Sequence, residues 1–115
     1  MSPARRAAAI TRGDVIRIRL PARRGAGHVQ QGPRYAVVVQ ADALAPLSTA
    51  IVAPTSTAVL PATFRPVIDV DGTPTRVLVE QLRTVDVTLL GTHAGHLSIA
   101  EQREVDHALE LVLDL

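Results

Sequence analysis

Prolines and glycines divide this chain into apolar stretches that are too short for anything but β-strands. Residues 15–20 alternate, which predicts a half-buried strand with Ile16, Ile18 and Leu20 on one face. Residues 35–40 form a nearly continuous β-branched run, which predicts a central strand covered on both faces. Further strands are predicted at 49–53, 64–70, 77–81 and 90–97.

The breaks between these strands carry their own signals. Pro54 is predicted to end the strand at 49–53, and Pro66 favours an edge position for the strand at 64–70 because proline lacks a backbone donor. The pair Asp71-Gly72 is a strong turn signal. Residues 82–86 are expected to form a tight helical turn.

The C-terminal part of the chain predicts an amphipathic helix. Ser98 and Glu101 form a capping box, in which each side chain satisfies a backbone N–H at the start of a helix. The apolar face is predicted to contain Ile99, Val105, Leu109 and Val112, with Leu113 near the same side. The pattern therefore predicts a mainly β fold with a C-terminal helix packed on a small curled sheet or barrel.

Length and composition favour one domain without covalent staples. The chain has 115 residues and no cysteine, so neither disulfides nor thiolate metal ligands are available. Its apolar runs are far shorter than the roughly 20 residues that span a bilayer. We expect a soluble, cytoplasmic protein with a flexible extension at 1–11 and a folded domain at 12–115.

The charge of the chain does not favour non-specific electrostatic binding of nucleic acid over a broad basic surface. The net charge is +1, yet all twelve basic residues are arginine, whose planar fork suits phosphate oxygens and base edges. A GC-rich genome would give the same bias toward arginine. With Tyr35 and Phe64 as the chain's two aromatic residues, a surface that stacks successive bases on rings is disfavoured.

Several chemistries lack their sequence support. His93 and His96 are three residues apart and His28 and His107 are scattered, so no zinc-site spacing occurs, and neither metal nor cofactor is expected. His107 reads as a solvated surface residue. Nucleophile-elbow, P-loop and dinucleotide-binding motifs are also missing from the sequence.

Polar residues gather instead at the ends of the predicted strands. His28 and Arg34 mark the two ends of a glycine-bearing loop, and residues 55–57 directly follow Pro54. Such side chains can converge on one concave face. The same residues could instead be a turn hydroxyl, a surface carboxylate and a local ion pair, with no functional site. The candidates are His28, Arg34, Thr55, Ser56, Thr57, Glu80, Gln81 and Arg83.

Four segments together resemble the MazF/PemK (Kid) family of toxins. They are R-G-D-V at 12–15, G-H-x-Q-Q-G-x-R at 27–34, A-P-T-S-T at 53–57 and E-Q-L-R-T-V-D at 80–86. The resemblance extends over residues 12–115 and implies an SH3-like β-barrel with a C-terminal helix. It also implies a homodimer that cleaves single-stranded RNA without metal, and a MazE-like antitoxin whose disordered tail covers the active groove.

The resemblance also implies roles for individual residues. Arg34 stands at the family's catalytic arginine, and Ser56 keeps the hydroxyl of the family's catalytic threonine. His28 and Glu80 match the histidine and the carboxylate of the Kid/PemK branch. The residues expected to bind RNA are Gln30, Gln31, Thr55, Thr57, Gln81 and Arg83.

Three positions depart from the family pattern. Val29 replaces a glutamate, Leu78 replaces an arginine of the Kid branch, and Tyr35 replaces the usual proline. The change at Leu78 removes one general acid, so His28 is the preferred proton donor if Glu80 is the base. The RNA motif that is cut depends on the loops at 22–33 and 58–63.

These residue types fit cleavage of RNA by its own 2′-hydroxyl. The expected products are a 2′,3′-cyclic phosphate and a 5′-hydroxyl, with Glu80 or His28 as the base, Arg34 stabilising the phosphorane and Ser56 bonding the phosphate. One alternative is a non-catalytic, CcdB-like toxin that binds a protein, and another is an inactive barrel partner. A pure protein binder would not need the pair Arg34 and Ser56.

Overall fold

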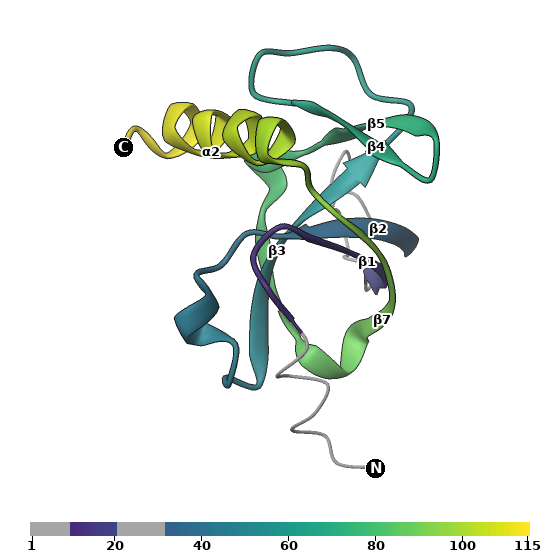
Figure 1. Ribbon diagram of the computed structural model, residues 1–115, viewed down its shortest axis with the longest axis vertical. Coiled ribbons are helices and arrows are strands. Elements are labelled where there is room, and N and C mark those ends of the chain that lie inside the picture. Colours follow the sequence, from purple (N-terminus) through teal and green to yellow (C-terminus); the bar gives the residue numbers. More distant parts are fainter. Residues whose placement is uncertain (1–9, 21–31) are drawn as a thin grey trace, which may run out of the picture.

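The fold is a half-barrel of β-strands with one α-helix at its C-terminal end (Figure 1). The computed structural model describes residues 10–20 and 32–115. The elements are β1 (Asp14–Leu20), β2 (Gly32–Val38), β3 (Thr49–Ser56), β4 (Val67–Val70), β5 (Thr73–Val77), β6 (Arg83–Asp86), β7 (Leu90–His96) and α2 (Ile99–Leu113). Their order is β4-β5-β3-β2-β1-β7, with β6 also paired to β3. The predicted mainly β fold with a C-terminal helix is confirmed.

The sheet has an apolar core on each of its two faces. Val37 on β2 belongs to the core beneath α2, whereas its neighbours Ala36 and Val38 belong to a second core inside the curl of the sheet. β2 also lies between β1 and β3, which confirms the prediction of a central strand covered on both faces. It begins at Gly32, so the predicted loop ends before Pro33.

β3 is longer than the sequence predicts and changes its partner part-way along. Residues 49–52 pair with β6, and Thr55 and Ser56 pair with β5. Pro54 lies between these two sets, so its missing N–H falls where the strand passes from one neighbour to the other. The prediction that Pro54 ends this strand is therefore wrong.

β4 and β5 form a hairpin at the edge of the sheet. β4 begins at Val67, directly after Pro66, and its edge position confirms the prediction made from that proline. Asp71 and Gly72 join the strands with φ values of 52° and 84°. Positive φ at both central residues is the geometry that Asp-Gly favours in a two-residue hairpin turn.

The predictions for 77–81 and 82–86 are wrong. The turn after β4 fixes the register so that Thr73 pairs with Val70, and β5 therefore ends at Val77. The N–H of Leu78 then donates to the carbonyl of Pro54, and the chain enters a 3₁₀ turn, η2 (Val79–Gln81). The following residues form β6 because they pair with β3, a contact distant in sequence that local pattern does not reveal.

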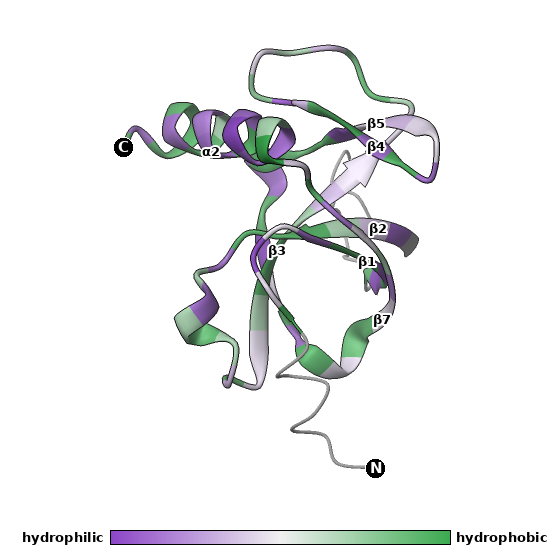
Figure 2. Cartoon of the chain, in the orientation of Figure 1, coloured by the Kyte–Doolittle hydropathy of each residue, from purple (hydrophilic) through white to green (hydrophobic). Residues whose placement is uncertain are grey.

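α2 begins and ends close to its predicted limits. Both hydrogen bonds of the capping box are present between Ser98 and Glu101. Val105 and Leu109 are buried against the sheet, as predicted. Ile99, by contrast, is 75% exposed, because the first turn of the helix extends beyond the core. Figure 2 shows apolar and polar residues alternating along this helix.

Asp14 fastens the start of β1 to the end of β7. Its buried carboxylate lies 2.8 Å from His96 Nδ1 and 3.0 Å from His93 Nε2, and it accepts a hydrogen bond from the Thr11 N–H at 2.8 Å. Burial acts to raise the pKa of Asp14, but the hydrogen bonds from His96, His93 and Thr11 outweigh it and hold the pKa below its ordinary value of 3.8.

This lowered pKa predicts a loss of stability in acid. A carboxylate that holds its proton less tightly in the folded state stabilises that state above the unfolded-state pKa, and the contribution disappears as the pH falls through the folded-state pKa. Asp14→Asn should therefore lower the free energy of unfolding at neutral pH and flatten its fall below about pH 4. Urea unfolding midpoints across this pH range check the prediction, with the exposed Asp69→Asn as control. Parallel curves for the wild type and Asp14→Asn would contradict it.

Among residues 10–20 and 32–115, no helix is long and apolar enough to cross a membrane.

Candidate functional site

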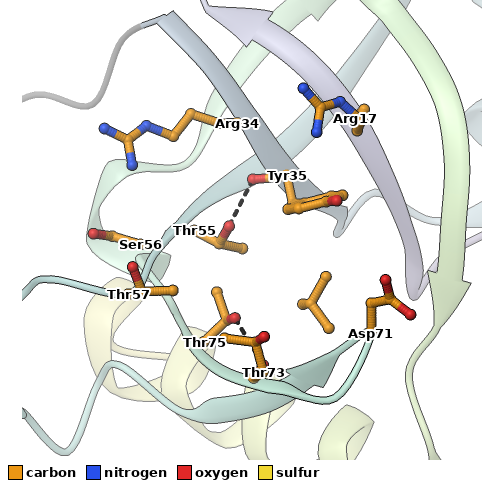
Figure 3. A pocket seen from close by; sticks show the side chains of 10 residues that line it. Arg17, Arg34, Tyr35, Thr55, Ser56, Thr57, Asp71, Thr73 and Thr75 are labelled. Atoms are coloured by element: carbon orange, nitrogen blue, oxygen red, sulfur yellow. Dashed lines mark hydrogen bonds between the residues drawn. The ribbon is translucent and has the colours of Figure 1, made fainter.

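A polar cavity of about 280 Å³ lies between the β1–β2 pair and the β4–β5 hairpin (Figure 3). The end of β3 joins the two sides, because it pairs with both β2 and β5. The cavity is lined by Arg17, Arg34, Tyr35, Thr55, Ser56, Thr57, Val70, Asp71, Thr73 and Thr75. Among the described residues that line the cavity, Arg17 and Arg34 carry guanidinium groups and Asp71 carries the one carboxylate, so the cavity favours an anionic ligand.

Arg34 reaches the cavity from the start of β2. Its backbone pairs with Ile18 of β1, which fixes the position of the strand. The side chain is half-buried, and the described residues provide no hydrogen-bond partner for its Nε. Leaving a buried donor unsatisfied is costly, so this nitrogen is available to an acceptor other than the described residues.

Hydroxyl groups at the end of β3 face the same space. Ser56 Oγ accepts a hydrogen bond from the backbone N–H of Ala58 at 3.1 Å, which leaves its own O–H free to donate. Thr55 Oγ1 donates to the carbonyl of Tyr35 at 2.8 Å and so holds β3 against β2. Figure 3 draws the Ser56 hydroxyl and the Arg34 guanidinium at the same end of the cavity.

The other end of the cavity contains residues that sequence reasoning missed. Tyr35 pairs directly with Arg17 across β2 and β1, and the Arg17 guanidinium carbon lies 5.3 Å from the centre of the tyrosine ring. Asp71 and Thr73 approach from the hairpin. The Arg17–Tyr35 contact depends on strand register, which the sequence does not reveal. Thr73 and Thr75 were missed because the strand was predicted to begin at residue 77, whereas β5 begins at Thr73.

Glu80 lies outside the lining of this cavity. One of its oxygens, Oε2, accepts hydrogen bonds from Arg65 Nε at 2.9 Å and Nη2 at 2.7 Å. The other oxygen, Oε1, is buried and has no hydrogen-bond partner among the described residues. Arg65 also donates to the carbonyl of Leu60, so Glu80 holds the loop between β3 and β4 in place.

The remaining candidates are distributed as follows. Arg34, Thr55, Ser56 and Thr57 line the same cavity, whereas Gln81 lies in η2 and Arg83 begins β6. Arg83 Nη1 is buried without a hydrogen-bond partner in the described part of the chain. Three further candidates lie outside the described residues: His28, Gln30 and Gln31.

The described histidines do not form a metal site. His93 and His96 contact Asp14, and His107 is exposed on α2 with Glu110 nearby. Over residues 10–20 and 32–115, no three metal-binding side chains are arranged to hold an ion.

Comparison with known proteins decides the family. Residues 11–113 match the model of the PemK-like, MazF-like toxins of type II toxin-antitoxin systems. The chain belongs to this family. Rv3098A/RVBD_3098A of Mycobacterium tuberculosis, which bears the provisional name of a toxin, is 41% identical over 108 residues, which are 92% of this chain and 99% of that one.

Solved MazF structures share the fold. MazF from Deinococcus radiodurans aligns with a TM-score of 0.79 at 19% identity, over 92% of this chain and 97% of that one. A mycobacterial endoribonuclease solved with its cognate antitoxin aligns with a TM-score of 0.76 at 18% identity, over 93% of this chain and 97% of that one. At these identities the two structures establish that the half-barrel with its C-terminal helix is a MazF fold.

Proposed function

We propose that this MazF-like toxin is a metal-independent endoribonuclease that cuts single-stranded RNA at a short sequence motif. The observation that carries the proposal is the meeting of Arg34 and Ser56 in one polar cavity. A cation and a hydroxyl whose donors have no partner within the described part of the chain are the groups that a phosphodiester needs. The names of the solved relatives as endoribonucleases support the same activity.

Each step of the reaction has a candidate residue. The 2′-hydroxyl of the RNA attacks the adjacent phosphorus, and its proton passes to the general base, for which the candidates are Glu80 and His28. Glu80 lies outside the lining of the cavity, so it would have to leave Arg65 to act there. The P–O5′ bond breaks, and the leaving 5′ oxygen takes a proton from the His28 imidazolium. Arg34 stabilises the negative charge of the phosphorane, and Ser56 donates a hydrogen bond to a phosphoryl oxygen. The products are a 2′,3′-cyclic phosphate and a 5′-hydroxyl.

Purified protein incubated with a mixed transcript library in EDTA tests this function. We expect cleavage in the presence of the chelator, with 5′ ends that a kinase labels without prior phosphatase treatment. Sequencing those ends gives the motif. If no transcript is cut with or without added divalent metal, the endoribonuclease proposal is wrong and a non-catalytic, CcdB-like toxin becomes the better explanation.

The role of Glu80 as base is tested by Glu80→Gln. The exchange preserves volume but removes the proton acceptor, so kcat should fall by about 10²–10⁴-fold while KM changes little. Thermal unfolding must be measured in parallel, because Arg65 loses its charged partner in this variant. A folded Glu80→Gln protein with unchanged kcat would contradict the assignment and leave His28 as the base.

The family and the fold support two partners. We propose a cognate MazE-like antitoxin, since one of the solved relatives was crystallised with its antitoxin. We also propose that the toxin is a homodimer, as its family membership suggests. It would act in the cytoplasm, because its RNA substrate is located there. A short reading frame with an acidic tail next to the gene would identify the antitoxin, and light scattering would measure the oligomeric state.

A further inference from the structure

The end of the cavity farthest from Arg34 and Ser56 has no task in the cleavage step. In Figure 3 this end is formed by Tyr35 and Arg17 on one side and by Asp71 and Thr73 on the other. The whole cavity, at about 280 Å³, is slightly smaller than typical pockets for small ligands of roughly 300–1,000 Å³. It therefore has room for one nucleotide-sized group beside the phosphate, not for several stacked bases.

Tyr35 gives this end an aromatic wall. The ring is partly buried against the core, so its position is fixed, and the Arg17 guanidinium carbon lies 5.3 Å from its centre. Single-stranded RNA is commonly read by stacking an unpaired base on an aromatic ring or on an arginine plane. Tyr35 and Arg17 provide both surfaces in one cross-strand pair.

Asp71 gives the same end a hydrogen-bond acceptor. The carboxylate has no hydrogen-bond or ion-pair partner among the described residues, although Arg17 and Arg34 line the same cavity. An ionised carboxylate only accepts hydrogen bonds. Guanine alone presents two adjacent donors, N1–H and the 2-amino group, on its Watson–Crick edge. The other three bases place a carbonyl oxygen or ring nitrogen acceptor beside their donor, which repels one carboxylate oxygen.

We propose that this end of the cavity binds a guanine base adjacent to the cleaved phosphate, with Tyr35 as its stacking surface and Asp71 as its specificity-determining acceptor. The inference rests on the proposed function for the position of the phosphate. The binding of guanine itself does not depend on cleavage, and so it can be measured without it.

Binding of uncleavable RNA tests the proposal. The probes are fluorescent 2′-fluoro uridine heptamers, which lack the attacking hydroxyl, with guanosine, inosine, adenosine, cytidine or uridine at the centre. We expect the guanosine heptamer to bind roughly 5- to 150-fold more tightly than the others, inosine included, because inosine lacks the 2-amino group. Equal dissociation constants for the five heptamers would overturn the proposal.

Two variants assign the selectivity to its residues. Asp71→Asn keeps a residue that tolerates positive φ in the turn, so the hairpin is retained while the second acceptor is lost. It should abolish the preference for guanosine over inosine. Tyr35→Leu should weaken all five heptamers by about fivefold or more without changing their order.

Asp69→Asn is the matched control. Asp69 has the same charge on the same hairpin and is exposed, as Asp71 is, but it does not line the cavity. If Asp69→Asn changed the base preference as much as Asp71→Asn, the assignment would be wrong. Selective binding without cleavage of any transcript would remove the proposed function and keep the guanine site, whereas cleavage without selective binding would do the reverse.

Discussion

Arg34→Ala is expected to lower kcat/KM for RNA cleavage by about 10²–10³-fold, the loss typical of removing one donor that stabilises transition-state charge. Arg34 is one of the two cations among the described residues that line the cavity, and its Nε has no hydrogen-bond partner among those residues. The substitution leaves the backbone pairing with Ile18 in place, so the folded state should persist. Gel-based rates and a thermal unfolding curve for each protein measure the two quantities separately.

The control for this experiment is Arg103→Ala. Arg103 is exposed on α2, away from the polar cavity, and its loss changes the net charge by the same amount. If long-range attraction of RNA were the whole contribution of Arg34, both variants would slow cleavage equally, and more so at low salt. Undiminished cleavage by a folded Arg34→Ala protein would exclude Arg34 from the chemistry.

Leu78→Ala is expected to lower the free energy of unfolding by about 2–5 kcal/mol. Leu78 is 0% exposed, and the backbone hydrogen bond from its N–H to Pro54 survives the substitution, so the loss is one of packing and cavity formation. Against a total stability of about 5–15 kcal/mol this is a large fraction. Urea unfolding at fixed pH measures it.

Leu60→Ala is the matched control for this prediction. The Leu60 side chain is 80% exposed, so its truncation should change the free energy of unfolding by less than about 0.5 kcal/mol. A comparable effect of the two substitutions would contradict the burial of Leu78. That burial also favours an apolar residue at this position, because a charged side chain here would have to be removed from water.

The parts of the fold predicted from sequence are those that local chemistry determines. Alternation predicted β1, the run of β-branched residues predicted β2, and Ser98 with Glu101 predicted the start of α2. The errors at 77–86 arose where a distant partner decides the structure. Residues 83–86 are a strand because β3 offers them an edge, and nothing in their own sequence indicates that edge.

The candidate site divides in the same way. Arg34 and Ser56 follow from motifs, and the structure brings them together. The sequence marks Tyr35 as one of two aromatic residues and as a departure from the family pattern, and it marks Asp71 as half of a turn. Their meeting in one cavity depends on the register of two separate strand pairs, which one sequence does not reveal. Glu80 is predicted by its motif, but its carboxylate pairs with Arg65 outside the cavity lining, and its role stays a prediction.

The change of partner along β3 makes the β4–β5 hairpin a distinct edge of the sheet, although Ile68, Val70 and Val77 pack in the same core as α2. The β4–β5 hairpin pairs with the rest of the sheet at Thr55–Val77 and Ser56–Arg76, on the far side of Pro54 from β6. Arg34 lies on the body of the sheet, whereas Asp71 lies at the tip of the hairpin. A relative with other cavity-facing residues in the segment 67–77 would therefore prefer a different RNA sequence. It would keep the same cleavage chemistry. In such a lineage, sequence variation would concentrate on one side of Pro54.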